Sequence, residues 1–131
     1  MNTHAAIHRV LLVDDDDNLR FLTQTGLEGM TDWEIEPASS GQEALEKAER
    51  CTPDVVLMDM MMPGMDGTTT MRKMREHPQL KDVPIIFLTA KVQVREKEQY
   101  LKLGATGVIV KPFDPITLCD EIQSILRSRK C

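Results

Sequence analysis

Residues 54–64 read DVVLMDMMMPG, and this stretch decides the fold. It begins as a continuous apolar run, which is typical of a central strand covered on both faces. The carboxylate of Asp59 ends the run, and a Pro-Gly turn signal follows it. Ligands of open α/β sheets bind outside the carboxyl ends of the strands, so the sequence marks Asp59 as a candidate site residue.

The composition is that of a single soluble globular domain: 131 residues, 41% hydrophobic and 28% charged. The net charge of −5 argues against non-specific binding to nucleic acid or to an anionic membrane. No apolar stretch is long enough to span a bilayer, and no signal-peptide core is present. The three cysteines are far apart and form no metal-ligand spacing. We therefore expect a reducing, cytoplasmic setting.

Strands and helices alternate five times along the chain. The expected strands are residues 10–13, 33–36, 54–59, 84–88 and 107–110. The first and fourth expected helices span about 19–29 and about 92–103. The second helix is expected after Ser40, the third after Asp66, and the fifth from Pro115 onward. This alternation implies a parallel sheet with helices on both faces. Pro37 makes the second strand an edge strand, which favours the order 2-1-3-4-5. The predicted fold class is α/β, a single doubly wound, five-stranded, flavodoxin-like (βα)5 domain.

Local signals refine this picture. A leucine stripe, Leu19, Leu22 and Leu27, is expected to line the first helix. Ser40 with Glu43 predicts a capping box at the second helix. Asp114 before a proline predicts an N-cap at the last helix. Capping also explains one or two of the four acids at 14–17, and a bound cation would relieve the repulsion among the others.

The predicted strand order gathers a set of polar residues at the carboxyl edge of the sheet: Asp14, Asp15, Asp59, Thr89 and Lys111. Carboxylates with loop carbonyls suit Mg²⁺, and a carboxylate can be a phosphoryl nucleophile. A lysine would offset charge on the transferring group, and a hydroxyl could hold a phosphoryl oxygen. Each residue also has an ordinary interpretation, as a strand-end acid, a turn-capping threonine or a surface lysine. The whole set is more specific than any member.

Four segments together resemble the receiver domain of two-component response regulators, including chemotaxis regulators: residues 10–16, 57–67, 88–90 and 104–113. The resemblance implies that residues 1–131 form a single receiver domain with a core of about 8–128. It also implies a phosphorylation-controlled signalling switch that transfers a phosphoryl group to itself and is not an enzyme acting on a separate substrate.

The resemblance implies a role for each matching acid. Asp59 would be the phosphoacceptor. Mg²⁺ would be bound by Asp15, by Asp59 and by the backbone carbonyl of Met61, with Asp14 acting through a water. Because the contact at Met61 would be made by the backbone, its side chain does not prevent metal binding.

The remaining roles are implied in the same way. Thr89 would move onto the phosphoryl group, and Lys111 would pair with that group or with the acids. The peptide between Lys111 and Pro112 would be cis by family habit. The donor would be a phosphohistidine on a sensor histidine kinase or a histidine phosphotransfer domain. The downstream protein would bind the face made by the fourth helix, the fifth strand and the fifth helix, with no direct nucleic-acid or membrane contact.

Three positions depart from the family pattern or flank its site. The family often has Tyr or Phe three residues before the lysine, where this chain has Val108, so the output face is expected to switch more weakly. Met61 and Lys91, two residues after Asp59 and Thr89, lie where the family controls access of the attacking water. Bulky Met61 and long Lys91 are expected to slow self-hydrolysis.

Other functions stay open at this point. An adaptor of the same fold that needs no phosphorylation is possible because of Val108. An aspartyl-nucleophile phosphatase is disfavoured because Met61 replaces the usual second acid, and a nucleotide or flavin binder lacks a glycine-rich loop. The chain is either a single-domain regulator or part of a longer protein, and the ends at Met1 and Cys131 favour the first.

Overall fold

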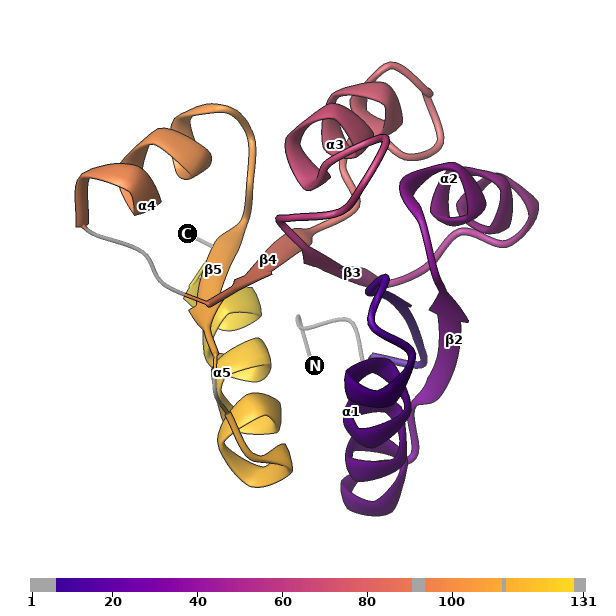
Figure 1. Ribbon diagram of the computed structural model, residues 1–131, viewed down its shortest axis with the longest axis vertical. Helices are drawn as coiled ribbons and strands as arrows, with labels where there is room; N and C mark the ends of the chain where they lie inside the picture. Colours follow the sequence, from indigo (N-terminus) through magenta and orange to yellow (C-terminus); the bar gives the residue numbers. More distant parts are fainter. Residues whose placement is uncertain (1–6, 91–93, 112, 129–131) are drawn as a thin grey trace, which may run out of the picture.

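Five parallel strands form one sheet in the order β2-β1-β3-β4-β5 (Figure 1). The computed structural model describes residues 7–90, 94–111 and 113–128. The strands are β1 (Arg9–Val13), β2 (Glu34–Ala38), β3 (Val55–Asp59), β4 (Ile85–Thr89) and β5 (Gly107–Val110). All five residues of β3 are buried at the centre of the sheet. The predicted fold class and strand order are confirmed.

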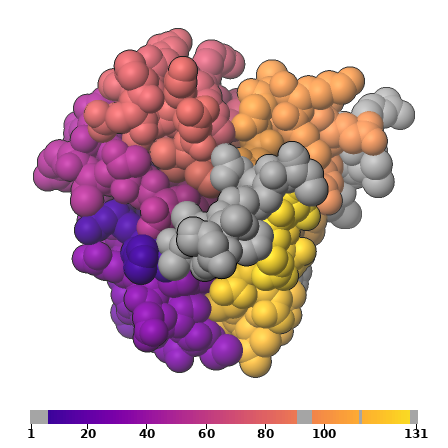
Figure 2. All heavy atoms as spheres, turned by 180° about the vertical axis from the view of Figure 1, so that it is seen from behind, coloured from indigo at the N-terminus to yellow at the C-terminus, as the bar shows by residue number. Residues whose placement is uncertain are grey.

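Helices cover both faces of the sheet. They are α1 (Asp17–Met30), α2 (Gly41–Arg50), α3 (Gly67–Arg75), α4 (Val94–Lys102) and α5 (Pro115–Ser128). Helices α1 and α5 lie on one side, and α2, α3 and α4 on the other (Figure 1). The view from behind shows the same division, with the purple and yellow segments together below and the magenta-to-orange segments above (Figure 2).

Two hydrophobic cores lie between the sheet and these helix layers. On β1, Val10 and Leu12 pack into the core beside α1 and α5, whereas Leu11 and Val13 pack into the core beside α2 and α3. Burying one such side chain contributes about 1.5–3 kcal/mol. A slip of one residue would exchange the two faces, so these cores fix the register of each strand. The register in turn determines which residues arrive at the carboxyl edge.

Short polar side chains cap four helices. The N-caps are Asp16 of α1, Ser40 of α2, Asp66 of α3 and Asp114 of α5. In each case a side-chain oxygen accepts a hydrogen bond from the backbone N–H three residues further on, at 2.8–3.1 Å. The cap predicted at Asp114 is confirmed, and α5 begins at Pro115 as expected.

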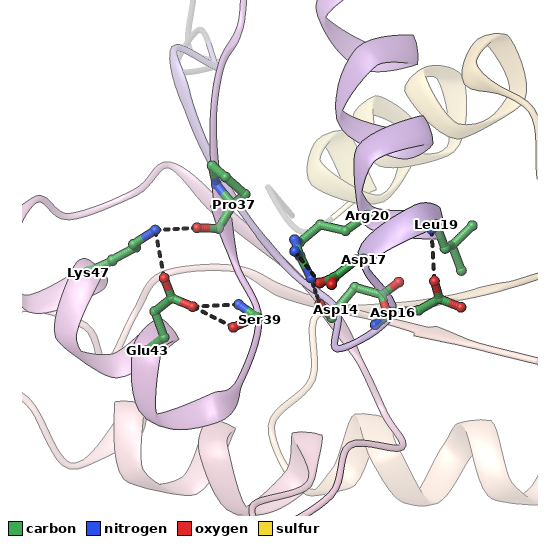
Figure 3. Close-up of polar contacts among 9 residues, drawn as sticks. All are labelled: Asp14, Asp16, Asp17, Leu19, Arg20, Pro37, Ser39, Glu43 and Lys47. Atoms are coloured by element: carbon green, nitrogen blue, oxygen red, sulfur yellow. Dashed lines mark hydrogen bonds and ion pairs between the residues drawn. The ribbon is translucent and has the colours of Figure 1, made fainter.

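The capping box at α2 differs from the prediction in one bond. Ser40 Oγ accepts from the Glu43 N–H as expected. The Glu43 carboxylate, however, accepts from the N–H of Ser39, at 2.7 Å, and from its hydroxyl, at 2.8 Å (Figure 3). Lys47 Nζ approaches the same carboxylate at 3.0 Å. The Glu43 carboxylate therefore bonds one residue earlier in the chain than predicted, at Ser39 and not at Ser40. Lys47 also donates to the carbonyl of Pro37.

Replacing Glu43 with glutamine is expected to lower the free energy of unfolding by about 1 kcal/mol at neutral pH, a value reduced because the carboxylate is 37% exposed. The Ser39 N–H, helped by Lys47, lowers the pKa of Glu43 from 4.5 to about 2. A lowered folded-state pKa stabilises the fold above pH 4.5, and the effect is lost as the pH falls toward 2. Denaturant unfolding of wild type and the Glu43 variant across this pH range measures the difference in the free energy of unfolding. Glu46→Gln, an exposed acid on the same helix, is the control, and an equal loss there would contradict the prediction.

The predicted stripe of α1 is wrong at Leu22, which is 64% exposed. Leu27 is buried as predicted, and Thr23 is the other buried residue of this helix. Because successive helix residues are about 100° apart, Leu22 is turned away from the face centred on Thr23. Gly26 lies beside Pro115, where an added Cβ would be 2.5 Å from the proline ring. This close approach of α5 fixes the rotation of α1.

Several element boundaries also differ from the prediction, by one or two residues. Strand β2 continues through Pro37 to Ala38, and Pro37 pairs in register with Leu12 of β1. An edge strand accepts proline because one of its sides has no ladder partner. Helix α4 begins at Val94, and the predicted residues 92 and 93 lie outside the described part of the chain.

Candidate functional site

The carboxyl edge of the sheet brings the predicted site residues together. Asp14 directly follows β1, Asp59 ends β3 and Thr89 ends β4. One carboxylate oxygen from each of Asp14, Asp15 and Asp59 lies within 4.8 Å of the other two. Lys111 follows β5 and places its Nζ 3.6 Å from Asp59 Oδ1 and 3.9 Å from Asp14 Oδ2. Three acids and one lysine thus share a small volume.

The four consecutive acids after β1 divide between this site and helix α1. Asp16 caps the helix, and Asp17 pairs with Arg20 at 2.7 Å. Arg20 also donates to the backbone oxygen of Asp14 at 2.6 Å (Figure 3). The Asp16 N–H donates to Asp14 Oδ1 at 2.9 Å. These bonds shape the loop, so that Asp14 and Asp15 reach the site while their neighbours hold the helix start.

Asp14 carries the strongest electrostatic conflict in the site. It is 2% exposed, and burial raises the pKa of its carboxyl. The Asp16 N–H and the Lys111 ammonium oppose that rise, whereas the carboxylates of Asp59 and Asp15 add to it. One lysine faces three acids, and a divalent cation would supply the missing positive charge.

The donor set fits a hard cation. Carboxylate oxygens are ligands that Mg²⁺ prefers, and this ion keeps several of its waters. Asp15 is exposed and the Met61 side chain is 75% exposed, so the site is open to solvent on that side. The N–H of Met61 donates to Asp59 Oδ1 at 3.3 Å, which places this part of the loop beside the acids. Mg²⁺ coordinated here would contribute charge beside the Asp59 carboxylate.

The other predicted residues lie as follows. Thr89 is buried, and its backbone oxygen accepts from the Lys111 N–H at 2.7 Å. Val108 is buried in the core beside α2 and α3. Lys91 and Pro112 lie outside the described residues, so the hypotheses of a Lys91 effect and of a cis peptide stay predictions.

Sequence reasoning passed over two residues that shape the site. Arg20 holds the Asp14 carbonyl, and its spacing of three from Asp17 was the available signal. Gly67 lies within the segment 57–67 that carries the family resemblance, but no role is predicted for it from the sequence. An added Cβ there would lie 2.9 Å from the backbone oxygen of Asp59 and 3.0 Å from Phe87 Cε1. A glycine at the first position of α3 therefore lets the helix approach the end of β3.

Comparison with known families agrees with this geometry. The family model described as the response regulator receiver domain matches residues 10–123. The chain belongs to this family. The predicted resemblance is confirmed, and the chain is a signalling module of the two-component type.

Curated relatives of this receiver domain are regulators. The probable transcriptional regulator ycf27 of Cyanidium caldarium is 39% identical over 120 residues, which cover 92% of this chain and 47% of that protein. The transcriptional regulatory protein SrrA of Staphylococcus aureus (strain NCTC 8325 / PS 47) is 40% identical over 120 residues, which cover 92% of this chain and 48% of that protein. The receiver domain thus spans about half the length of these relatives.

Solved structures resemble the receiver domain over nearly its whole length. The chemotaxis response regulator CheY4 of Vibrio cholerae superposes with a TM-score of 0.85 at 36% identity, covering 92% of this chain and 99% of that one. A CheY-like receiver domain protein of Methanospirillum hungatei JF-1 superposes with a TM-score of 0.81 at 28% identity, covering 95% of this chain and 98% of that one.

Within the described residues, no helix has the length and apolar character needed to cross a membrane.

Proposed function

We propose that this receiver domain is a switch controlled by phosphorylation of Asp59. The observation that carries the proposal is the position of this carboxylate, buried at the end of the central strand, within 4.8 Å of two other acids and 3.6 Å from Lys111. A carboxylate so placed meets the needs of a phosphoryl nucleophile with an adjacent cation.

The transfer uses a phosphohistidine on a histidine kinase or a phosphotransfer domain. A carboxylate oxygen of Asp59 attacks phosphorus, and the bond between phosphorus and the imidazole nitrogen breaks. That nitrogen keeps the electron pair and the histidine is released, leaving an acyl phosphate on Asp59. Lys111 stabilises the negative charge on the transferring oxygens, and the Thr89 hydroxyl holds one of them afterwards.

Mg²⁺ is the cofactor of this proposal. Asp15, Asp59 and the carbonyl of Met61 would hold the ion, and Asp14 would act through a bound water. When bound, the ion adds positive charge beside the phosphoryl oxygens. The three clustered carboxylates support this assignment.

The response reaches other proteins through the face of α4, β5 and α5. A cavity of about 390 Å³ lies there, lined by residues of α4, β5 and α5 and by Thr106, which precedes β5.

The net charge of −5 disfavours direct contact of the domain with nucleic acid. We propose a cytoplasmic location, where the free thiols of Cys51 and Cys119 stay reduced.

Mass spectrometry of the intact protein tests the proposal. The protein is incubated with acetyl phosphate, a small acyl phosphate, in the presence of Mg²⁺ or of a chelator. We expect one added phosphoryl group with Mg²⁺ and none with the chelator. No phosphate under any metal condition would contradict the proposal and favour an adaptor that works without phosphorylation. Turnover of a generic phosphomonoester would instead favour a phosphatase.

Replacing Met61 with asparagine is expected to speed the loss of phosphate from Asp59. The backbone N–H of Met61 lies 3.3 Å from Asp59 Oδ1, so its long side chain is expected to hinder water near the phosphoacceptor, although its 75% exposure limits this effect. We expect decay to accelerate roughly two- to fivefold, equivalent to about 0.4–1 kcal/mol of barrier. The rate is measured by intact mass, as the fraction of protein that still carries phosphate at successive times after the donor is removed. Met30→Asn, at the far end of α1, is the control, and equal rates in wild type and the Met61 variant would contradict the hypothesis.

A further inference from the structure

One aromatic ring packs the described side chains of helix α4 against the core. Among the described side chains at 96–102, Tyr100 is the one that is not exposed. Its ring meets Phe87 of β4 edge-on, with centroids 5.8 Å apart and planes at 75°. Both rings belong with Val108 to the core beside α2 and α3. Edge-to-face pairs of this kind prefer one geometry, so the ring of Tyr100 helps to set where α4 lies on the sheet.

The end of α4 is fixed by a second contact. The helix is followed by Gly104, whose φ of +119° suits glycine, and the carbonyl of Gly104 accepts from Arg75 Nη2 at 3.0 Å. Residues 96–99 at the other end carry exposed side chains. Helix α4 is therefore anchored near its C-terminal end, by the ring of Tyr100 and by the contact of Arg75 with the residue that follows the helix.

A continuous line of contacts joins this anchor to the phosphoacceptor. The backbone of Asp59 lies against Gly67, and Gly67 lies against the ring of Phe87, each closely enough that a single added methyl group would collide. Phe87 is fully buried and touches Tyr100. Phe87 is also two residues before Thr89 on β4. Close-packed interiors transmit displacement because they hold no free space, so a shift at either strand end reaches the ring pair.

We infer that Tyr100 is a positioning residue that carries the state of the Asp59 site to α4 through Phe87. The inference rests on the proposed function. The usual aromatic residue of the family is replaced on β5 by Val108, and Tyr100 supplies a ring to the same core from the helix. The output face then switches through a ring on the moving helix, and the small side chain of Val108 does not make the switch weaker.

Nuclear magnetic resonance with matched variants tests this inference. Tyr100 is the only tyrosine, so fluorotyrosine labelling gives a single fluorine resonance. Amide resonances of α4 are followed in wild type, Tyr100→Ala, Tyr100→Phe and Leu101→Ala, the last removing a 39% exposed side chain from the same helix. Each protein is phosphorylated with acetyl phosphate and Mg²⁺, and its intact mass is recorded first.

We expect equal phosphorylation in all four proteins and a shift of the fluorine resonance in the labelled wild type. Wild type, Tyr100→Phe and Leu101→Ala should show α4 amide shifts, whereas Tyr100→Ala should lose most of them and keep those near Asp59 and Thr89. An unmoved fluorine resonance in phosphorylated protein, or a full α4 response in Tyr100→Ala, would overturn the inference alone. Absence of phosphate on the wild type would overturn the proposed function as well, and the mass identifies that case.

Discussion

Substituting asparagine for Asp59 is expected to reduce phosphorylation below detection. The amide keeps the shape of the side chain, but its oxygen is a poor nucleophile and forms no stable acyl phosphate. The substitution also removes one of three clustered carboxylates, so Mg²⁺ should bind more weakly. Without metal, the free energy of unfolding should rise by roughly 1 kcal/mol, because two repelling acids outweigh one attracting lysine. Intact mass after incubation with acetyl phosphate, and denaturant unfolding with and without Mg²⁺, measure these effects.

Asp16→Asn is the matched control for this substitution. It likewise removes one negative charge, from the acidic run that follows β1, and asparagine still caps α1. We expect this variant to be phosphorylated like wild type and to keep its response to Mg²⁺. Phosphate that persists on the Asp59 variant would show that another side chain accepts it. A loss of phosphorylation in the Asp16 variant would mean that net charge, and not the position of Asp59, governs the reaction.

The strand order was predictable because few alternatives fit the apolar runs. A strand with proline must lie at an edge, and a fully apolar strand such as residues 55–58 must lie inside. Those two constraints place β2 and β3, and the parallel topology then brings one end of every strand to the same edge. The clustering of Asp14, Asp59 and Lys111 follows from that topology without any knowledge of side-chain conformation.

Predictions that depended on side-chain direction were less successful. Leu22 was expected inside because leucine is apolar, but its exposure depends on how Gly26 and Pro115 set the rotation of α1. Glu43 was expected to bond to Ser40, but the nearer donor groups belong to Ser39. Both outcomes depend on how neighbouring segments pack against one another. Residue types and spacing do not contain that information.

The contact of Tyr100 with Phe87 was outside the reach of sequence reasoning for the same reason. The fourth helix has a thin apolar side, and a tyrosine among charged residues gives no sign that it faces the core. Only the packing of α4 against β4 shows which ring fills the space beside Val108. The absence of an aromatic residue on β5 was visible in the sequence, whereas the ring that occupies the same core became visible only in three dimensions.

Replacing Lys111 with alanine is expected to change two properties in opposite directions. The ammonium lies 3.6 Å from Asp59 and 3.9 Å from Asp14, where it competes with any bound cation. Its removal should strengthen Mg²⁺ binding severalfold, because three acids then face the ion with no internal cation. Phosphorylation should slow by at least about tenfold, because the transferring group loses a charged partner that typically contributes more than 1.4 kcal/mol.

Isothermal titration with Mg²⁺ and the rate of mass gain with acetyl phosphate measure the two properties of the Lys111 variant. Lys102→Ala, which removes an exposed lysine from α4, is the control for net charge and should leave both unchanged. The opposite signs give the experiment its strength, because a variant that folds poorly would lose metal binding and phosphorylation together. Weaker Mg²⁺ binding would mean that Lys111 holds the acids in place and does not compete with the ion. An unchanged rate would mean that the metal alone balances the charge of the transferring group, and the role assigned to Lys111 would then be wrong.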